Sequence, residues 1–178
     1  MRVIAGSAKS IRLQYPKGEK IRPTPDRVRE SLFASLGDQV VGSRFCDLYA
    51  GAGSVGIEAL SRGAQSAVFV EKNSRCLEAL RTNLANTHLA ELATVFSGSL
   101  PKCFTEVWQK LAPFDIVFAD PPYSVDIAPL LRIATKLIGA HDTLLIVQCD
   151  SRAAPEVAGL RQVRRQQFGG TVLLWYET

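Results

Sequence analysis

The stretch Asp47-Leu48-Tyr49-Ala50-Gly51-Ala52-Gly53-Ser54-Val55-Gly56 indicates the class of fold most directly. Its three glycines match the pattern G-x-G-x-x-G. An apolar run that predicts a strand precedes them, and apolar residues at helical spacing follow them. A glycine-rich turn between a strand and a helix is typical of α/β domains that bind a nucleotide-containing cofactor.

Strand-like and helix-like segments alternate along the rest of the chain. We expect strands at 44–49, 67–71, 93–96, 114–119 and 144–149, helices at 55–62, 73–86, 104–111 and 127–138, and a closing hairpin at 162–167 and 171–176. This alternation predicts an α/β fold: a doubly wound, mostly parallel sheet with an antiparallel hairpin at its C-terminal edge, one strand of which is the antiparallel edge strand.

Composition excludes several classes of protein. The 178 residues are 47% hydrophobic and 21% charged, a balance that disordered and fibrous chains do not have. No apolar run approaches the roughly 18 residues of a membrane span, and residues 1–13 do not resemble a secretory signal. Four widely spaced cysteines without a CxxC pair are typical of reduced thiols in a cytoplasmic protein, and they predict no metal site.

The positive charge is concentrated near the N-terminus. Residues 1–36 hold eight Lys or Arg against three acids, a net +5 compared with +4 for the whole chain, so the other 142 residues carry −1. We expect a basic extension over 1–36, with short strands at 2–5 and 11–14 and a helix capped by Thr24, followed by the main domain over 37–178. Such an extension favours a polyanionic partner; a merely solvated terminus is the alternative.

Two acidic residues indicate which cofactor the glycine loop binds. Glu71 lies 18 residues after Gly53, at the end of the next expected strand, where a carboxylate accepts hydrogen bonds from ribose hydroxyls. Asp47 lies beside the position of a dinucleotide's pyrophosphate, and two like charges would repel there. S-adenosylmethionine (SAM) carries a cationic sulfonium and ammonium, so we expect SAM.

The motif Asp120-Pro121-Pro122-Tyr123 follows the expected strand at 114–119. The Asp120 carboxylate and the Pro121 carbonyl can accept both protons of an exocyclic amine on a base, which directs the nitrogen lone pair at a methyl donor. Prolines hold such a turn rigidly, and Tyr123 can stack on an unpaired base. We therefore expect methyl transfer to a base amine through positioning, without a strong general base.

Together with these motifs, the segments 2–6, 21–33 and 58–64 resemble the bacterial family that methylates guanine N2 in small-subunit ribosomal RNA. The resemblance covers nearly the whole chain, and Arg-Pro-Thr-x-Asp-Arg-Val-Arg-Glu is its most specific motif. It implies a Rossmann-like, SAM-dependent, monomeric cytoplasmic enzyme that acts on 16S ribosomal RNA within the assembled small subunit.

The resemblance also implies roles for residues of this chain. The catalytic residues would be Asp120, Pro121, Pro122 and Tyr123, and the RNA contacts Arg22, Thr24 and Arg27. The cofactor would be bound by Asp47, Tyr49, Gly51, Gly53, Glu71, Lys72 and Ser99.

The chain departs from the family pattern at a few positions. Ser99 stands where many relatives have an acid that meets the adenine amine, Gln148 stands where an acid often ends the fifth strand, and the first hairpin lacks one arginine.

Other functions fit part of these patterns. A DNA adenine-N6 methyltransferase would share the strand-end chemistry, although 178 residues leave little room for a target-recognition domain. A nicotinamide-dependent oxidoreductase would share the glycine pattern, and a catalytically silent RNA-binding factor would share the fold.

Overall fold

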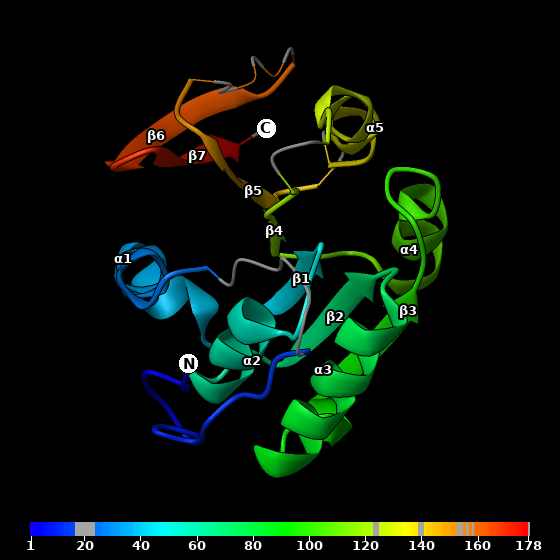
Figure 1. Cartoon of the computed structure of the whole chain (residues 1–178). Coiled ribbons are helices and arrows are strands. Elements are labelled where there is room, and N and C mark those ends of the chain that lie inside the picture. Colours follow the sequence, from blue (N-terminus) through cyan, green and yellow to red (C-terminus); the bar gives the residue numbers. More distant parts are fainter. Residues whose placement is uncertain are drawn as a thin grey trace.

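The computed structural model describes residues 1–16, 24–122, 125–138, 141–152, 155, 157 and 159–177. Its centre is one seven-stranded sheet in the order β3-β2-β1-β4-β5-β7-β6 (Figure 1). The strands are β1 (Arg44–Leu48), β2 (Ser66–Glu71), β3 (Ala93–Ser97), β4 (Ile116–Ala119), β5 (Leu144–Asp150), β6 (Arg161–Phe168) and β7 (Thr171–Glu177).

Helices cover both faces of this sheet. Helices α1, α2 and α3 share a hydrophobic core with one face, and α4 and α5 share a second core with the other (Figure 1). The helices are α1 (Asp26–Leu36), α2 (Ser54–Ser61), α3 (Ser74–Asn86), α4 (Phe104–Leu111) and α5 (Ala128–Ile138), with 3₁₀ turns η1 (Gly37–Val40) and η2 (Ala90–Leu92). The predicted doubly wound α/β fold is confirmed, with element ends within a few residues of those expected.

The central strands are apolar because both of their faces are covered. All four residues of β4 are buried, as are the last four of β1. Continuous apolar runs of this kind are typical of parallel strands between two helical layers. Pairing is parallel from β3 through to β5.

The C-terminal hairpin differs in one detail from the expectation of an antiparallel edge strand. Strand β7 is buried between β5 and β6 and runs antiparallel to both. The outer strand β6 therefore runs parallel to β5, and most of its residues are exposed. The antiparallel strand is thus the second from the edge.

The N-terminal segment does not form the two expected strands. A single antiparallel bridge joins Arg2 to Arg12, and the Val3 and Leu13 N–H groups donate across it to the Ile11 and Met1 carbonyls. Other N–H groups of the segment donate to side chains of α2 and α3 instead. Val3 and Leu13 nevertheless join the hydrophobic core that α1 shares with the sheet.

Thr24 does not cap α1 as predicted. Pro25 occupies the cap position without a side-chain hydrogen bond, and the Thr24 hydroxyl is engaged elsewhere. None of the helices in the described ranges is long and apolar enough to cross a membrane.

Candidate functional site

The candidate site lies at the carboxyl ends of β1, β2, β4 and β5. The chain moves outward from β1 to β2 and β3 and then crosses back to β4, so β1 and β4 flank the point where the strand order reverses. Ligands of open α/β sheets bind at such a point. Asp47 on β1, Glu71 at the end of β2 and Asp120 just after β4 come to this edge as the sequence predicted.

The glycine loop joins β1 to α2 in a conformation that needs its glycines. Gly51 and Gly53 have φ of 56° and 85°, in the left-handed region. A Cβ atom on Gly53 would lie 2.3 Å from Leu80 Cδ1, whereas one on Gly51 would meet nothing within 4 Å. Gly53 therefore allows α3 to pack closely against the loop, and Gly51 lies beside open space.

The Asp47 side chain is hydrogen-bonded to the end of this loop, at the first turn of α2. Its side chain is 2% exposed, and Oδ2 accepts a hydrogen bond of 2.9 Å from the Gly56 N–H. Burial raises the pKa of Asp47 to about 8; the Gly56 hydrogen bond opposes this rise, and the nearby Asp120 and Glu71 carboxylates add to it. Burial therefore favours the protonated form of Asp47 near neutral pH.

The Glu71 carboxylate is hydrogen-bonded to the backbone of the glycine loop at Gly51. Oε2 accepts from the Gly51 N–H at 2.8 Å, and Oε1 accepts from the Lys72 and Asn73 N–H groups at 2.8 Å each. A carboxylate oxygen can accept two hydrogen bonds, so Oε2 retains capacity for a ribose hydroxyl. The half-buried carboxylate beside the open space at Gly51 thus fits the sugar of a nucleoside cofactor.

Asp120 is held by two neutral donors from distant parts of the chain. Its Oδ2 accepts from Thr24 Oγ1 at 3.0 Å and from Gln148 Nε2 at 2.9 Å. Burial raises the pKa of Asp120 to about 7, although both hydrogen bonds lower it. No residue in the described part of the chain donates to Oδ1, which remains available to a substrate donor.

The remaining motif residues differ in their surroundings. Pro121 is buried and Pro122 is exposed, and Tyr123 lies outside the described residues. Tyr49 has a φ of 63°, and its buried hydroxyl has no hydrogen-bond partner within the described ranges. Such an orphaned buried group calls for a partner, which a water molecule or a ligand atom could supply.

Two further residues of the predicted cofactor set lie at the surface. Ser99 and Lys72 are exposed, and both contribute backbone groups to local hydrogen bonds: Ser99 accepts from the Cys103 N–H, and Lys72 donates to Glu71. Their side chains are free to turn toward a ligand.

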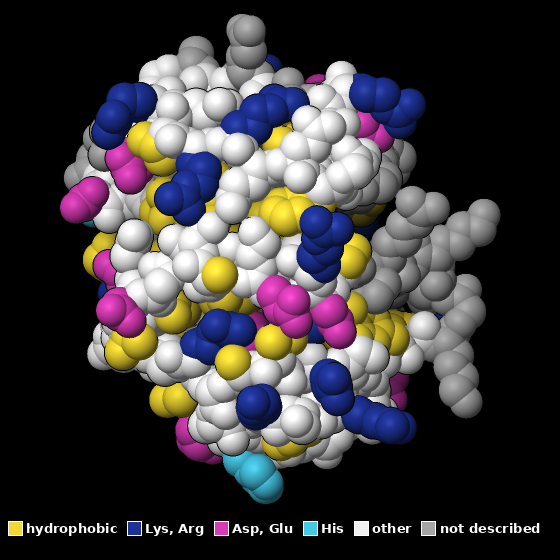
Figure 2. Space-filling model, turned by 90° about the vertical axis from the view of Figure 1, so that its left-hand side faces the viewer, with side chains coloured by type: hydrophobic (Ala, Val, Ile, Leu, Met, Phe, Trp, Pro, Cys, Tyr) yellow, Lys and Arg dark blue, Asp and Glu magenta, His cyan; other side chains and the backbone are white. Residues whose placement is uncertain are grey.

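The expected RNA contacts are only partly visible. Arg27 is exposed on α1, Thr24 is buried against Asp120, and Arg22 lies outside the described residues. Arg29, counted among the basic residues of the extension, is fully buried. Figure 2 shows Lys and Arg side chains dispersed among acidic and hydrophobic ones on the α1 side of the molecule, without a single basic patch.

Sequence reasoning did not place Gln148 in the site, although it noted the residue as a departure. The available signal is a polar residue inside the apolar run of β5, because a buried amide needs a partner. The described residues include no group of three or more His, Cys, Asp or Glu arranged to hold a metal ion.

Comparison with known proteins gives consistent matches over the whole chain. Residues 1–177 match the family model described as Conserved hypothetical protein 95. The chain is 37% identical over 178 residues to the "Ribosomal RNA small subunit methyltransferase D" of Escherichia coli K12, which covers 97% of this chain and 86% of that relative.

Two solved structures are similar to this chain in their three-dimensional fold. A hypothetical protein of Thermus thermophilus has a TM-score of 0.83 at 28% identity and covers 100% of this chain and 99% of its own. An RNA methyltransferase from Salinibacter ruber, solved with S-adenosyl-L-homocysteine, has a TM-score of 0.69 at 19% identity and covers 88% and 93%. The second likeness is one of fold alone.

Proposed function

Because the chain belongs to the family described as Conserved hypothetical protein 95 and is 37% identical to a small-subunit ribosomal RNA methyltransferase, we infer that it is a SAM-dependent RNA methyltransferase. We propose that its target is the exocyclic N2 amine of a guanine in 16S ribosomal RNA. The observation that carries transfer to an exocyclic amine is the Asp120 carboxylate, fixed through Oδ2 with Oδ1 left to accept; the choice of 16S ribosomal RNA rests on the 37% identical relative.

The residues at the sheet edge fit SAM. Glu71 would accept from the ribose hydroxyls, and the backbone at Gly51 would let the cofactor approach closely. The buried Tyr49 hydroxyl offers an unused polar group nearby, and Ser99 replaces the usual acid near the adenine. When bound, SAM supplies an electrophilic methyl group on a sulfonium.

Asp47 argues against a nicotinamide dinucleotide at this loop. The N–H groups at a helix N-terminus are the groups that bind a pyrophosphate. Here the Gly56 N–H of α2 is already bound to Asp47 Oδ2 at 2.9 Å. A dinucleotide would have to compete with this buried side chain for the same donor.

Positioning by Asp120 and Pro121 would activate the amine. The two acceptors would accept hydrogen bonds from both N–H groups of the guanine amine, which would direct its lone pair toward the methyl group that SAM supplies. The N–C bond would form as the C–S bond breaks and S-adenosylhomocysteine leaves, and the ammonium product would then lose a proton to water. Rate enhancement comes from alignment and from the charge of the carboxylate rather than from a strong base.

Methyl transfer from radiolabelled SAM tests the substrate. Undermethylated small ribosomal subunits, naked ribosomal RNA and duplex DNA are compared, with nucleoside analysis of the products. N2-methylguanine in small-subunit RNA is the expected product, and an assembled subunit is the expected better substrate. Label in DNA adenine would instead support the adenine-N6 alternative.

An Asp120→Ala variant tests the mechanism. We expect methyl transfer to fall by at least about a hundredfold while affinity for S-adenosylhomocysteine stays within about threefold, since Glu71 and the glycine loop are intact. Glu71→Ala is the matched variant. We expect it to show the opposite pattern, in which affinity for S-adenosylhomocysteine falls more than methyl transfer does. Activity retained in Asp120→Ala would refute the role of the carboxylate.

A further inference from the structure

Two backbone groups of the glycine loop lack their usual helical partner, and two buried side chains bind them instead. In a regular helix the Gly56 N–H would donate to the Ala52 carbonyl, four residues earlier. The left-handed turn at Gly53 prevents this bond. The Gly56 N–H donates to Asp47 instead, and the Ala52 carbonyl accepts from Asn83 Nδ2 at 2.9 Å.

Asn83 binds a second segment with the same amide group. The side chain projects from α3 and is fully buried. Its Oδ1 accepts from the Gln14 N–H at 2.7 Å, and its Nδ2 donates to the Gln14 carbonyl at 3.0 Å. One amide therefore joins the glycine loop to the end of the N-terminal segment.

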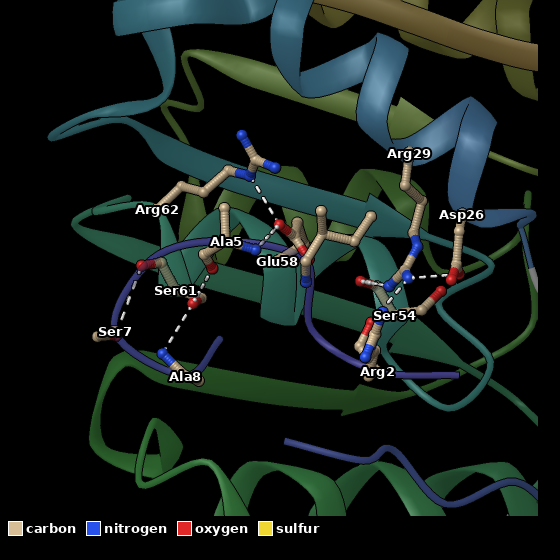
Figure 3. A network of polar contacts seen from close by, with 11 residues as sticks. Arg2, Ala5, Ser7, Ala8, Asp26, Arg29, Ser54, Glu58, Ser61 and Arg62 are labelled. Atoms are coloured by element: carbon tan, nitrogen blue, oxygen red, sulfur yellow. Dashed lines mark hydrogen bonds and ion pairs between the residues drawn. The ribbon is translucent and has the colours of Figure 1, made fainter. Parts of the chain in front are cut away.

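Arg29 makes the same connection from the other side. Its guanidinium is fully buried; Nη1 donates to the Ser54 carbonyl at 3.3 Å, and Nη2 donates to the Arg2 carbonyl at 2.8 Å and to Asp26 (Figure 3). A buried guanidinium is costly to desolvate unless its donors are used. The loop, the N-terminal segment and α1 together accept from the two Nη atoms, whereas Nε has no hydrogen-bond partner among the described residues.

Other buried side chains hold the N-terminal segment without touching the loop. Ser61, at the far end of α2, donates to the Ala5 carbonyl at 2.6 Å and accepts from the Ala8 N–H at 2.9 Å (Figure 3). Ser61 thus anchors the same segment as Arg29 and Asn83, and it provides an internal control for them.

We propose that Asn83 and Arg29 are positioning residues for the cofactor loop, which they hold in shape by tying the Ala52 and Ser54 carbonyls to the backbone of the N-terminal segment. The inference rests on the proposed function, because it assumes that this loop binds SAM. Under this inference, residues 1–16 belong to the basic extension and also help to hold the cofactor loop in shape.

The expected effect follows from the lost hydrogen bonds. A loop whose buried carbonyl loses its donor relaxes toward other conformations, and a ligand then binds only the fraction that keeps the competent shape. We expect Asn83→Leu, which keeps the volume but removes the amide, to weaken S-adenosylhomocysteine binding about tenfold. Arg29→Lys keeps the charge but cannot bridge two carbonyls as the fork does, and a similar loss is expected.

The test measures S-adenosylhomocysteine affinity and thermal unfolding of the full chain for the wild type, Asn83→Leu, Arg29→Lys and Ser61→Ala. All three variants should unfold at lower temperature than the wild type. Only the first two should lose affinity at a temperature where every protein is folded, and Ser61→Ala should stay within about twofold. The KM for SAM should rise in the same two variants, with kcat at saturating SAM nearly unchanged.

The other outcomes are distinguishable. Wild-type affinity in both Asn83→Leu and Arg29→Lys would overturn the inference, as would an equal loss in Ser61→Ala, because the effect would then follow general destabilisation. A wild-type protein that does not bind S-adenosylhomocysteine would overturn the proposed function, and the inference with it.

Discussion

Removing the Gln148 amide should change the pH at which the enzyme becomes active. Gln148 is 4% exposed; its Nε2 donates to Asp120 Oδ2 at 2.9 Å, while its Oε1 has no partner among the described residues. Gln148→Leu therefore deletes one used donor and one unused buried acceptor in nearly the same volume. The two deletions oppose each other in the free energy of unfolding, so the fold should tolerate the change.

The magnitude follows from the hydrogen bond to the carboxylate. A hydrogen bond to a charged group contributes about 1.5–3 kcal/mol, and about 1.36 kcal/mol corresponds to one pH unit. Because Asp120 is partly exposed, the lower end applies. The donor stabilises the ionised form, so its loss raises the pKa of Asp120 further, from about 7 by about one pH unit.

The assay is kcat/KM for RNA methylation from about pH 5.5 to about pH 9.5, since this ratio reports groups of the free enzyme. In the proposed mechanism the carboxylate is the active form, so we expect activity to rise with pH through the pKa of Asp120. Gln148→Leu should move this acid limb to higher pH and recover near wild-type activity on the alkaline plateau. Thr24→Val, which removes the other donor to the same oxygen, should move it in the same direction.

Two results would refute this reasoning. An unchanged midpoint in Gln148→Leu would mean that another group controls the limb; the neighbouring carboxyl group of Asp47 on β1, with a pKa raised to about 8, is the candidate. A uniform loss of activity at every pH would indicate a structural role only. Gln39→Leu, a change at an exposed position of η1, is the matched control and should leave the profile unchanged.

Two other perturbations test the electrostatics of the molecule. The pKa of Asp47 is raised from an ordinary value of 3.8 to about 8 in the folded state, so its contribution to stability is fully present below about pH 4 and is lost as pH rises through about 8. Asp47→Asn, which still accepts from Gly56, should flatten this decline between about pH 4 and about pH 8 in urea unfolding. Arg27→Glu should weaken RNA binding and reduce the slope of log affinity against log salt by about 1–2, whereas Arg81→Glu on α3 should not; equal slopes would make the Arg27 charge irrelevant to RNA.

The fold follows from local patterns, and for that reason the sequence predicts it well. Apolar runs, helical spacing and the glycine loop each depend on neighbouring residues, and they recur in β1, α2 and β4 as expected. The prediction of two N-terminal strands was wrong because the alternation of apolar and polar residues predicts an extended backbone but not the partner of that backbone. Here the two arms share only one antiparallel bridge, and other backbone groups of the segment bind side chains of α2 and α3.

The site is less predictable because its contacts join distant residues. Thr24 looks like a helix cap in its own segment, yet its hydroxyl reaches Asp120, 96 residues away. Asn83 lies three residues after the buried Leu80, on the buried face of α3. A polar residue on an apolar face signals a partner to be found, but the sequence does not say that the partner is the Ala52 carbonyl.

The three carboxyl groups at the sheet edge explain why a cationic cofactor suits it. Asp47, Glu71 and Asp120 come from the ends of three adjacent strands, and the Asp120 and Glu71 charges both raise the pKa of Asp47. Asp47 and Asp120, with pKa values of about 8 and about 7, therefore bind protons near neutral pH and limit their repulsion. A cation at this edge would favour ionisation of both groups, whereas an anion would oppose it. A preference for a sulfonium would thus not require a fixed charge on Asp47, because buried carboxyl groups with raised pKa values can release protons when a positive charge binds.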